Sequence, residues 1–117
     1  MFDNLYYYKA RVVRVYDGDT IHVDIDLGLS TWIKKEKLRL ARINAPEIRG
    51  SQRPAGLAAR DFLRNLILDK EVIVQTIKDR KGKYGRYLAE IWLQTENGWE
   101  NVNDRMLAEG FARPYSD

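Results

Sequence analysis

Cysteine is absent from this chain of 117 residues, and histidine occurs once, as His22. Without cysteine the chain forms no disulfide and offers no thiolate ligand to a metal. A single histidine also excludes a metal centre built from several imidazoles. His22 falls in a strand-like segment, where an ordinary surface or packing role is expected. Thiolate and histidine-rich metal centres are therefore excluded.

Long apolar runs are missing as well. No stretch approaches the roughly 18 consecutive apolar residues that indicate a membrane-spanning helix. Residues 1–8 contain neither the basic segment nor the extended apolar segment of a secretory signal. We therefore expect a cytoplasmic protein with no membrane partner.

Neither sign of charge dominates strongly. The chain carries 20 Lys and Arg against 17 Asp and Glu, a net charge of +3, which selects no partner by itself. It is 44% hydrophobic and 32% charged, as a folded protein is expected to be. Its length suits one domain with a modest core, and no repeat, linker or low-complexity segment divides it. We expect a single domain over residues 1–117, acting as a monomer.

Hydrophobic periodicity predicts five strands and two helices. Alternating residues predict strands at 8–16, 20–27 and 32–43, separated by turns at Asp17-Gly18 and Gly28. A helical stripe follows over 54–68, with Pro54 in the first turn. Two further strands are predicted at 71–78 and 84–93. A short helix then ends at Gly110, capped by Asn101 or Asn103.

The predicted order is β-β-β-α-β-β-α, a mainly β fold with helices (α+β). Five short strands with a helix between the third and fourth suit a five-stranded Greek-key barrel of the OB type. Closure into a barrel also removes exposed sheet edges. An SH3-like barrel is the alternative, and the inserted helix at 54–68 favours the OB fold.

One carboxylate in the first turn exceeds what the turn requires. Asp17 and Gly18 form a tight turn by themselves, so a second carboxylate at Asp19 needs another explanation. Hard cations such as Ca²⁺ and Mg²⁺ prefer oxygen ligands. Asp19 and the end of the third strand at Asn44 and Ala45 are candidates to share one such ion.

Two arginines and a glutamate complete a set of groups suited to phosphate chemistry. Arg39 lies on the strand face opposite Leu38 and Leu40, and Glu47 follows the end of that strand. Charged residues at a strand end are usually solvated, so these two residues also fit an ordinary surface without a function. Arg86 belongs to a basic segment that also reads as an ordinary hairpin turn. Guanidinium groups bind phosphate in a bidentate manner and stabilise its transition-state charge, and a carboxylate can orient or deprotonate water.

Three motifs in this order resemble those of the staphylococcal nuclease (thermonuclease) family. They are Asp-Gly-Asp-Thr at 17–20, Arg-Leu-Ala-Arg-Ile-Asn-Ala-Pro-Glu at 39–47 and Lys-Tyr-Gly-Arg at 83–86, with a helix between the last two. The resemblance covers roughly residues 11–113. It implies an OB barrel with helices, which agrees with the order of elements.

The resemblance also implies roles for matching residues. Asp19 would be the main Ca²⁺ ligand with Asp17 nearby, and Asn44 and Ala45 match two further ligand positions, Ala45 through its carbonyl. The remaining matches are the phosphate-binding Arg39 and Arg86, the general base or water-orienting Glu47, and the nucleotide-phosphate contacts Lys83 and Tyr84. Whether Tyr115 replaces a nucleotide-contacting tyrosine stays open.

The implied activity is Ca²⁺-dependent hydrolysis of DNA and RNA with little sequence preference. The enzyme would cleave the P–O5′ bond of single-stranded substrates and leave 3′-phosphates. Asn44 departs from the family pattern, because an aspartate ligand is expected there, and the loop at 48–53 is shorter than expected. The alternative function is therefore a weak or inactive domain that binds single-stranded nucleic acid or a protein partner. A purely structural domain is a third possibility.

Overall fold

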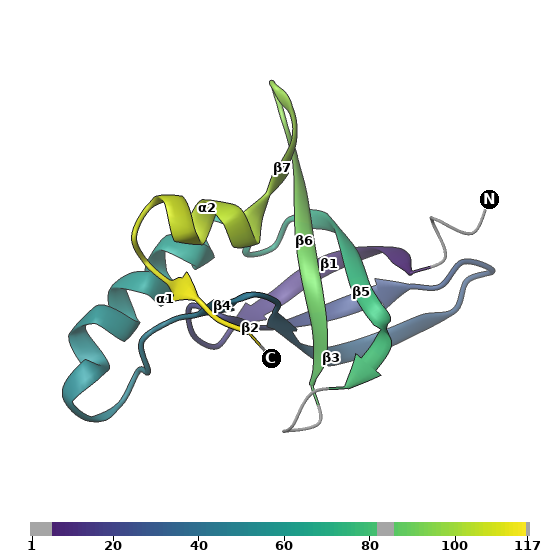
Figure 1. The fold of residues 1–117 in the computed structure, drawn as a ribbon. Coiled ribbons are helices and arrows are strands. Elements are labelled where there is room, and N and C mark those ends of the chain that lie inside the picture. Colours follow the sequence, from purple (N-terminus) through teal and green to yellow (C-terminus); the bar gives the residue numbers. More distant parts are fainter. Residues whose placement is uncertain (1–5, 82–85, 117) are drawn as a thin grey trace.

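A computed structural model describes residues 6–81 and 86–116, with residues 78–81 described by their backbone alone. Figure 1 shows a β-barrel with two helices gathered at one end and the long β2–β3 hairpin extending from the other. No helix in these two ranges has the length and apolar character needed to cross a membrane.

Five strands close into a barrel. They are β1 (Tyr7–Val15), β2 (Thr20–Asp26), β3 (Trp32–Leu40), β5 (Glu71–Lys81) and β6 (Tyr87–Thr95). The hydrogen-bonded order is β3-β2-β1-β5-β6, with antiparallel neighbours, and parallel pairing of β3 with β6 closes the ring. This mixed, closed arrangement confirms the predicted OB-type barrel, and the SH3-like alternative is set aside.

Alternate strand residues and one helix face make the core. Helix α1 (Arg53–Ile67) contributes Gly56, Ala59, Leu63 and Ile67. The buried strand residues include Val12, Val15, Ile21, Val23, Leu38, Leu40, Val72, Val74 and Ile91. The apolar residues within 54–68 include Ala58, which the sequence predicts to be buried in the stripe; that prediction was wrong, because the buried face passes through Gly56 and leaves Ala58 exposed.

The third strand ends earlier than predicted. It stops at Leu40, and a turn at Ala41-Arg42 separates it from β4 (Ile43–Asn44), which pairs with β8 (Arg113–Pro114). Arg42 has φ 69°, a left-handed conformation that cannot continue a strand. The prediction of one strand over 32–43 was therefore wrong at its end, and the chain leaves the barrel in a new direction before Asn44.

Several other boundaries also differ from the prediction by a few residues. Strand β5 continues to Lys81 instead of 78, and β6 begins at Tyr87 instead of 84. An additional strand, β7 (Gly98–Asn101), extends the sheet beside β6. The second helix, α2 (Val102–Ala108), is capped by Asn101, whose side chain accepts a hydrogen bond from the Asp104 N–H. A short 3₁₀ turn, η2 (Gly50–Gln52), precedes α1.

Candidate active site

Asp19 lies at the turn between β1 and β2, where it joins two segments distant in sequence. Its carboxylate is buried and accepts a hydrogen bond at Oδ2 from the Ala45 N–H, at 2.8 Å. Oδ1 accepts the hydroxyl of the neighbouring Thr20 at 3.2 Å. A buried carboxylate is unfavourable unless hydrogen bonds or positive charge compensate it. Asp19 therefore ties the β1–β2 turn to the segment that follows β4.

Gly18 makes this contact sterically possible. A Cβ placed at this residue would lie 2.7 Å from the Cβ of Ala45 and 2.8 Å from the Cβ of Ala59. Both distances are shorter than carbon atoms tolerate. The glycine in the Asp-Gly-Asp motif is thus required for close packing of the turn against Ala45 and α1, in addition to forming the turn.

Asp17 adds a second carboxyl group beside Asp19. Its Oδ1 accepts the Asp19 N–H at 3.0 Å. Burial, together with the nearby negative charge of Asp19, raises the pKa of Asp17 to about 6. Two neighbouring acids in a partly buried turn create a local negative potential that a cation would relieve.

Arg39 lies between Asp19 and Asn44. Its guanidinium donates to Asn44 Oδ1 at 3.3 Å, and the same nitrogen is 3.6 Å from Asp19 Oδ2. The Tyr115 ring centroid lies 5.0 Å from the guanidinium carbon, a cation–π distance. The structure thus brings Tyr115 against Arg39, one of the phosphate-binding candidates.

Arg86 approaches the same place from the beginning of β6. It donates to Thr20 Oγ1 at 2.9 Å, and Thr20 in turn donates to Asp19. The two arginines therefore reach the Asp19 turn from separate parts of the chain, Arg39 from β3 and Arg86 from the position just before β6. Lys83 and Tyr84 lie outside the described residues.

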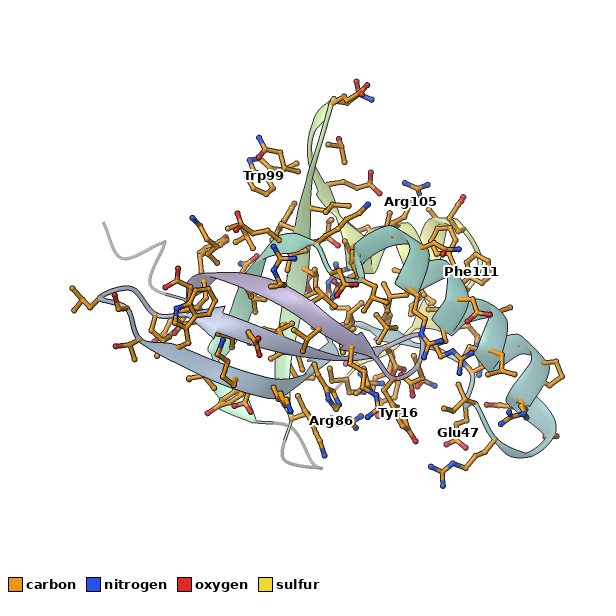
Figure 2. All side chains as sticks on the ribbon, turned by 180° about the vertical axis from the view of Figure 1, so that it is seen from behind. Tyr16, Glu47, Arg86, Trp99, Arg105 and Phe111 are labelled. Atoms are coloured by element: carbon orange, nitrogen blue, oxygen red, sulfur yellow. The ribbon has the colours of Figure 1, made fainter. Side chains whose placement is uncertain are left out.

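The Glu47 side chain is exposed, and its backbone N–H is hydrogen-bonded to a residue just before α1. Its N–H donates to Gln52 Oε1 at 3.0 Å. Glu47 shares with Asn44 and Ala45 the lining of a polar pocket of about 430 Å³, which Arg49, Gly50, Ser51 and Gln52 complete. In Figure 2 the labelled side chains of Glu47, Tyr16 and Arg86 lie along the same lower edge of the molecule.

Direct contacts join Asp19, Arg39, Asn44, Ala45 and, through Thr20, Arg86 into one cluster. Glu47 joins this cluster through the pocket that it shares with Asn44 and Ala45. Three chain segments supply the cluster: the β1–β2 turn, the chain from β3 to the loop after β4, and the beginning of β6.

The oxygen ligands for a hard cation are few. Within the described residues no group of three or more His, Cys, Asp and Glu is placed to hold a metal. Asp19 supplies the only buried carboxylate at the cluster, and Asn44 supplies a neutral amide oxygen. Together with the Ala45 carbonyl, this donor set fits a hard, oxygen-ligated cation that keeps several waters.

Gly56 is a residue of the site that sequence reasoning overlooked. It is buried in α1, and a Cβ there would collide with the carbonyl group of Glu47 and lie 2.9 Å from Ile48 N. Helix α1 therefore packs directly on the backbone of the segment that carries Glu47. A glycine within a helical pattern was the available signal, because it often marks such a close approach.

Comparison with known proteins agrees with this geometry. The family model described as "Staphylococcal nuclease homologue" matches residues 37–117. This chain belongs to the staphylococcal nuclease family. Its match includes the end of β3, the loop with Glu47, α1 and Arg86. The Asp17–Thr20 turn precedes the matched range and is connected to it by the Asp19–Ala45 hydrogen bond.

Individual relatives of the family extend the match toward the N-terminus. A thermonuclease of Staphylococcus hyicus is 37% identical over 106 residues, which cover 88% of this chain and 57% of that protein. A micrococcal nuclease of Shigella flexneri is 34% identical, with coverage of 92% and 59%. An uncharacterized protein of Methanocaldococcus jannaschii is 32% identical, with coverage of 93% and 60%. The chain thus spans less than two thirds of the length of these relatives.

Proposed function

We propose that this protein is a nuclease that hydrolyses phosphodiester bonds of single-stranded DNA and RNA. The observation that carries the proposal is the approach of two guanidinium groups, from Arg39 and Arg86, to the turn that holds the buried Asp19. Membership of the staphylococcal nuclease family supports the same reaction class. All the proposed residues come from one chain, so a monomer suffices.

The two arginines bind the scissile phosphate. Each presents N–H donors in a planar fork that matches phosphate oxygens. In the transition state negative charge builds on the equatorial oxygens, and fixed positive groups stabilise it more than they stabilise the substrate. Arg39 is held by Asn44 and Tyr115, and Arg86 by Thr20, so little reorganisation is needed.

Glu47 orients or deprotonates the attacking water. Its side chain is exposed at the polar pocket next to Asn44 and Ala45, where water is available. The water oxygen forms a new bond to phosphorus and its proton passes to Glu47, while the P–O5′ bond breaks and the leaving O5′ takes a proton from solvent water. The products are a 3′-phosphate and a free 5′-hydroxyl.

A Ca²⁺ ion would be held by Asp19, Asn44 and the Ala45 carbonyl, with Asp17 adding negative charge nearby. When bound, the ion supplies positive charge that polarises a phosphate oxygen. Because Asn44 is neutral and already accepts a hydrogen bond from Arg39, the site has less negative charge than one with a second carboxylate. We therefore propose weak Ca²⁺ binding, with activity that requires millimolar-range metal.

Substrate contacts are made to the backbone and to base faces. Lys83 and Tyr84 are proposed to hold a neighbouring phosphate, and the Tyr115 ring beside Arg39 offers a stacking surface. Such contacts carry little sequence information, so we expect weak base preference.

The decisive experiment measures cleavage of fluorescently labelled single-stranded DNA and RNA with Ca²⁺, Mg²⁺ or Mn²⁺. The wild type should cleave with Ca²⁺ and stop when a chelator is added. Arg86→Ala and Glu47→Ala should each abolish cleavage, while the far-ultraviolet circular dichroism spectrum stays unchanged. Arg60→Ala removes a partly exposed arginine that pairs with Asp61 on α1, and it should cleave like the wild type.

The second candidate function is binding without cleavage, and the neutral Asn44 favours it. A wild type that binds labelled single strands but is inert with all three metals would establish that function instead. Arg39→Ala should then weaken binding. No binding and no cleavage would contradict both candidate functions.

A further inference from the structure

Arg42 occupies a backbone conformation that its side chain does not favour. It follows β3 in the two-residue turn before β4, with φ 69°. L-residues with a Cβ pay a steric cost in the left-handed region, so glycine or asparagine is usual there. A strained residue that is not glycine persists when surrounding contacts over-determine it.

The Arg42 side chain makes such contacts with two carboxylates. Its Nε and one terminal nitrogen donate to the two oxygens of Glu90, both at 2.7 Å. The same terminal nitrogen donates to Asp104 Oδ1 at 2.9 Å. Glu90 belongs to β6, and its side chain is only 13% exposed, with Asn101 donating to it as well. We call these three residues, Arg42, Glu90 and Asp104, the Arg42 clamp.

The backbone of the same turn is held from two further sides. The Arg42 carbonyl accepts the Tyr115 N–H at 2.8 Å. The fully buried Asn103 of α2 donates to the Ala41 carbonyl at 3.0 Å. Ala41 is thus held by α2, and Arg42 is held by the residue that follows β8. Contacts outside β3 therefore fix the backbone of the turn.

The turn lies directly before the proposed metal and water-orienting residues. Asn44 and Ala45 follow Arg42 by two and three residues, and the Ala45 N–H meets Asp19. A rotation in the turn would therefore move Asn44, Ala45 and Glu47 relative to Asp19. Small displacements of this kind are costly to catalysis, where about 1 Å can change a rate by about 100-fold.

We propose that the Arg42 clamp is a positioning device that sets the segment from Asn44 to Glu47 against the Asp19 turn. Its effect on activity rests on the function proposed above, whereas its effect on the Ala45–Asp19 hydrogen bond does not. Because the Arg42 side chain is half exposed, its ion pairs contribute little to global stability, and their role is local.

The test substitutes Arg42→Gly, since glycine adopts the left-handed conformation without strain and removes the clamp together with the Cβ. Backbone amide hydrogen exchange is followed by nuclear magnetic resonance in the metal-free protein. We expect exchange of the Ala45 amide, which donates to Asp19, to rise at least tenfold, together with that of Tyr115. The Val12 amide, which donates to the Lys70 carbonyl in the barrel, reports global opening and should change much less.

Two further variants sharpen the result. Arg42→Lys keeps the charge but cannot form the bidentate pair, so it should show an intermediate rise. Arg105→Gln on α2 removes an ion pair with Glu100 of β7, and its arginine is about as exposed as Arg42; this variant should leave Ala45 exchange unchanged. An unchanged Ala45 amide in Arg42→Gly, or an equal rise at Val12, would overturn the proposal.

Activity gives the second readout. Arg42→Gly should lower the cleavage rate at least tenfold and raise the Ca²⁺ concentration for half-maximal activity, and Arg105→Gln should change neither. Full activity in Arg42→Gly would count against the clamp. An inert wild type would contradict the proposed nuclease function, while the exchange experiment would still decide the role of the clamp.

Discussion

Replacing Gly56 by alanine should move Glu47 and lower the proposed activity. The new Cβ would lie only 2.5 Å from the carbonyl carbon of Glu47 and 2.9 Å from Ile48 N. Carbon atoms pack at about 3.5–4.0 Å, so helix or loop must shift by roughly 1 Å. A displacement of this size at a catalytic group costs about 100-fold in rate.

The stability effect of Gly56→Ala has two opposing parts. Alanine in a helix interior is better than glycine by about 0.5–1 kcal/mol. Overpacking at a buried position costs about 1–3 kcal/mol. The two ranges leave a net loss of up to about 2.5 kcal/mol, which should lower the thermal midpoint by several degrees in a domain of this size.

The assay compares cleavage rate at 25 °C with thermal unfolding, using Ala58→Gly as the matched control. Ala58 is exposed on the same helix, so the control loses about 0.5–1 kcal/mol of helix stability without touching Glu47. We expect Gly56→Ala to lose activity and Ala58→Gly to keep it. Full activity in Gly56→Ala, or equal losses in both variants, would refute the reasoning.

Three further predictions concern charge and backbone strain. Asn44→Asp should lower the Ca²⁺ concentration for half-maximal cleavage, because it adds an anionic ligand beside Asp19; an unchanged metal titration would argue against Asn44 as a ligand. His22 faces Arg14 and Lys37 across its neighbouring strands, and burial, with these two positive charges, lowers its pKa. The unfolded chain therefore binds the proton more readily, so the contribution of His22 to the free energy of unfolding is fully present above about pH 6.5 and is lost as the pH falls below it. Urea unfolding between pH 7 and 5 should show a smaller loss of stability in His22→Gln than in the wild type. An equal loss in both proteins would contradict the assignment. Leu29 is fully exposed and has φ 54°, a left-handed conformation that strains a residue with a Cβ. Leu29→Gly removes this strain and should raise the free energy of unfolding by up to about 1 kcal/mol. A lower free energy of unfolding would show that the strain is small.

The candidate site depends on a junction between the barrel and its surroundings. The barrel strands bring Arg39 and Arg86 near the β1–β2 turn because β3 and β6 pair in parallel, with Arg39 opposite Leu88. The segment from Asn44 to Glu47 lies outside the barrel. Its place is determined by β8, α2 and the close approach of Gly56 in α1.

Sequence alone was sufficient for the order of the five barrel strands and α1, and it supplied the candidate residues of the site. Strand and helix periods are local properties, so alternation in 20–27 and the apolar stripe of α1 were readable without the fold. The motifs containing Asp19, Arg39 and Arg86 consist of residue types in a fixed order, and they contain no information on the distances between these residues.

Tertiary structure decided what local patterns do not contain. The strand predicted over 32–43 ends at Leu40, because Arg42 turns left-handed under contacts from Glu90, Asp104 and Tyr115. Those partners lie 48 or more residues away along the chain. Long-range partners also explain why Gly18 and Gly56 looked like ordinary glycines in the sequence. Their requirement comes from the backbone and side chains packed against them, which only the folded chain brings together.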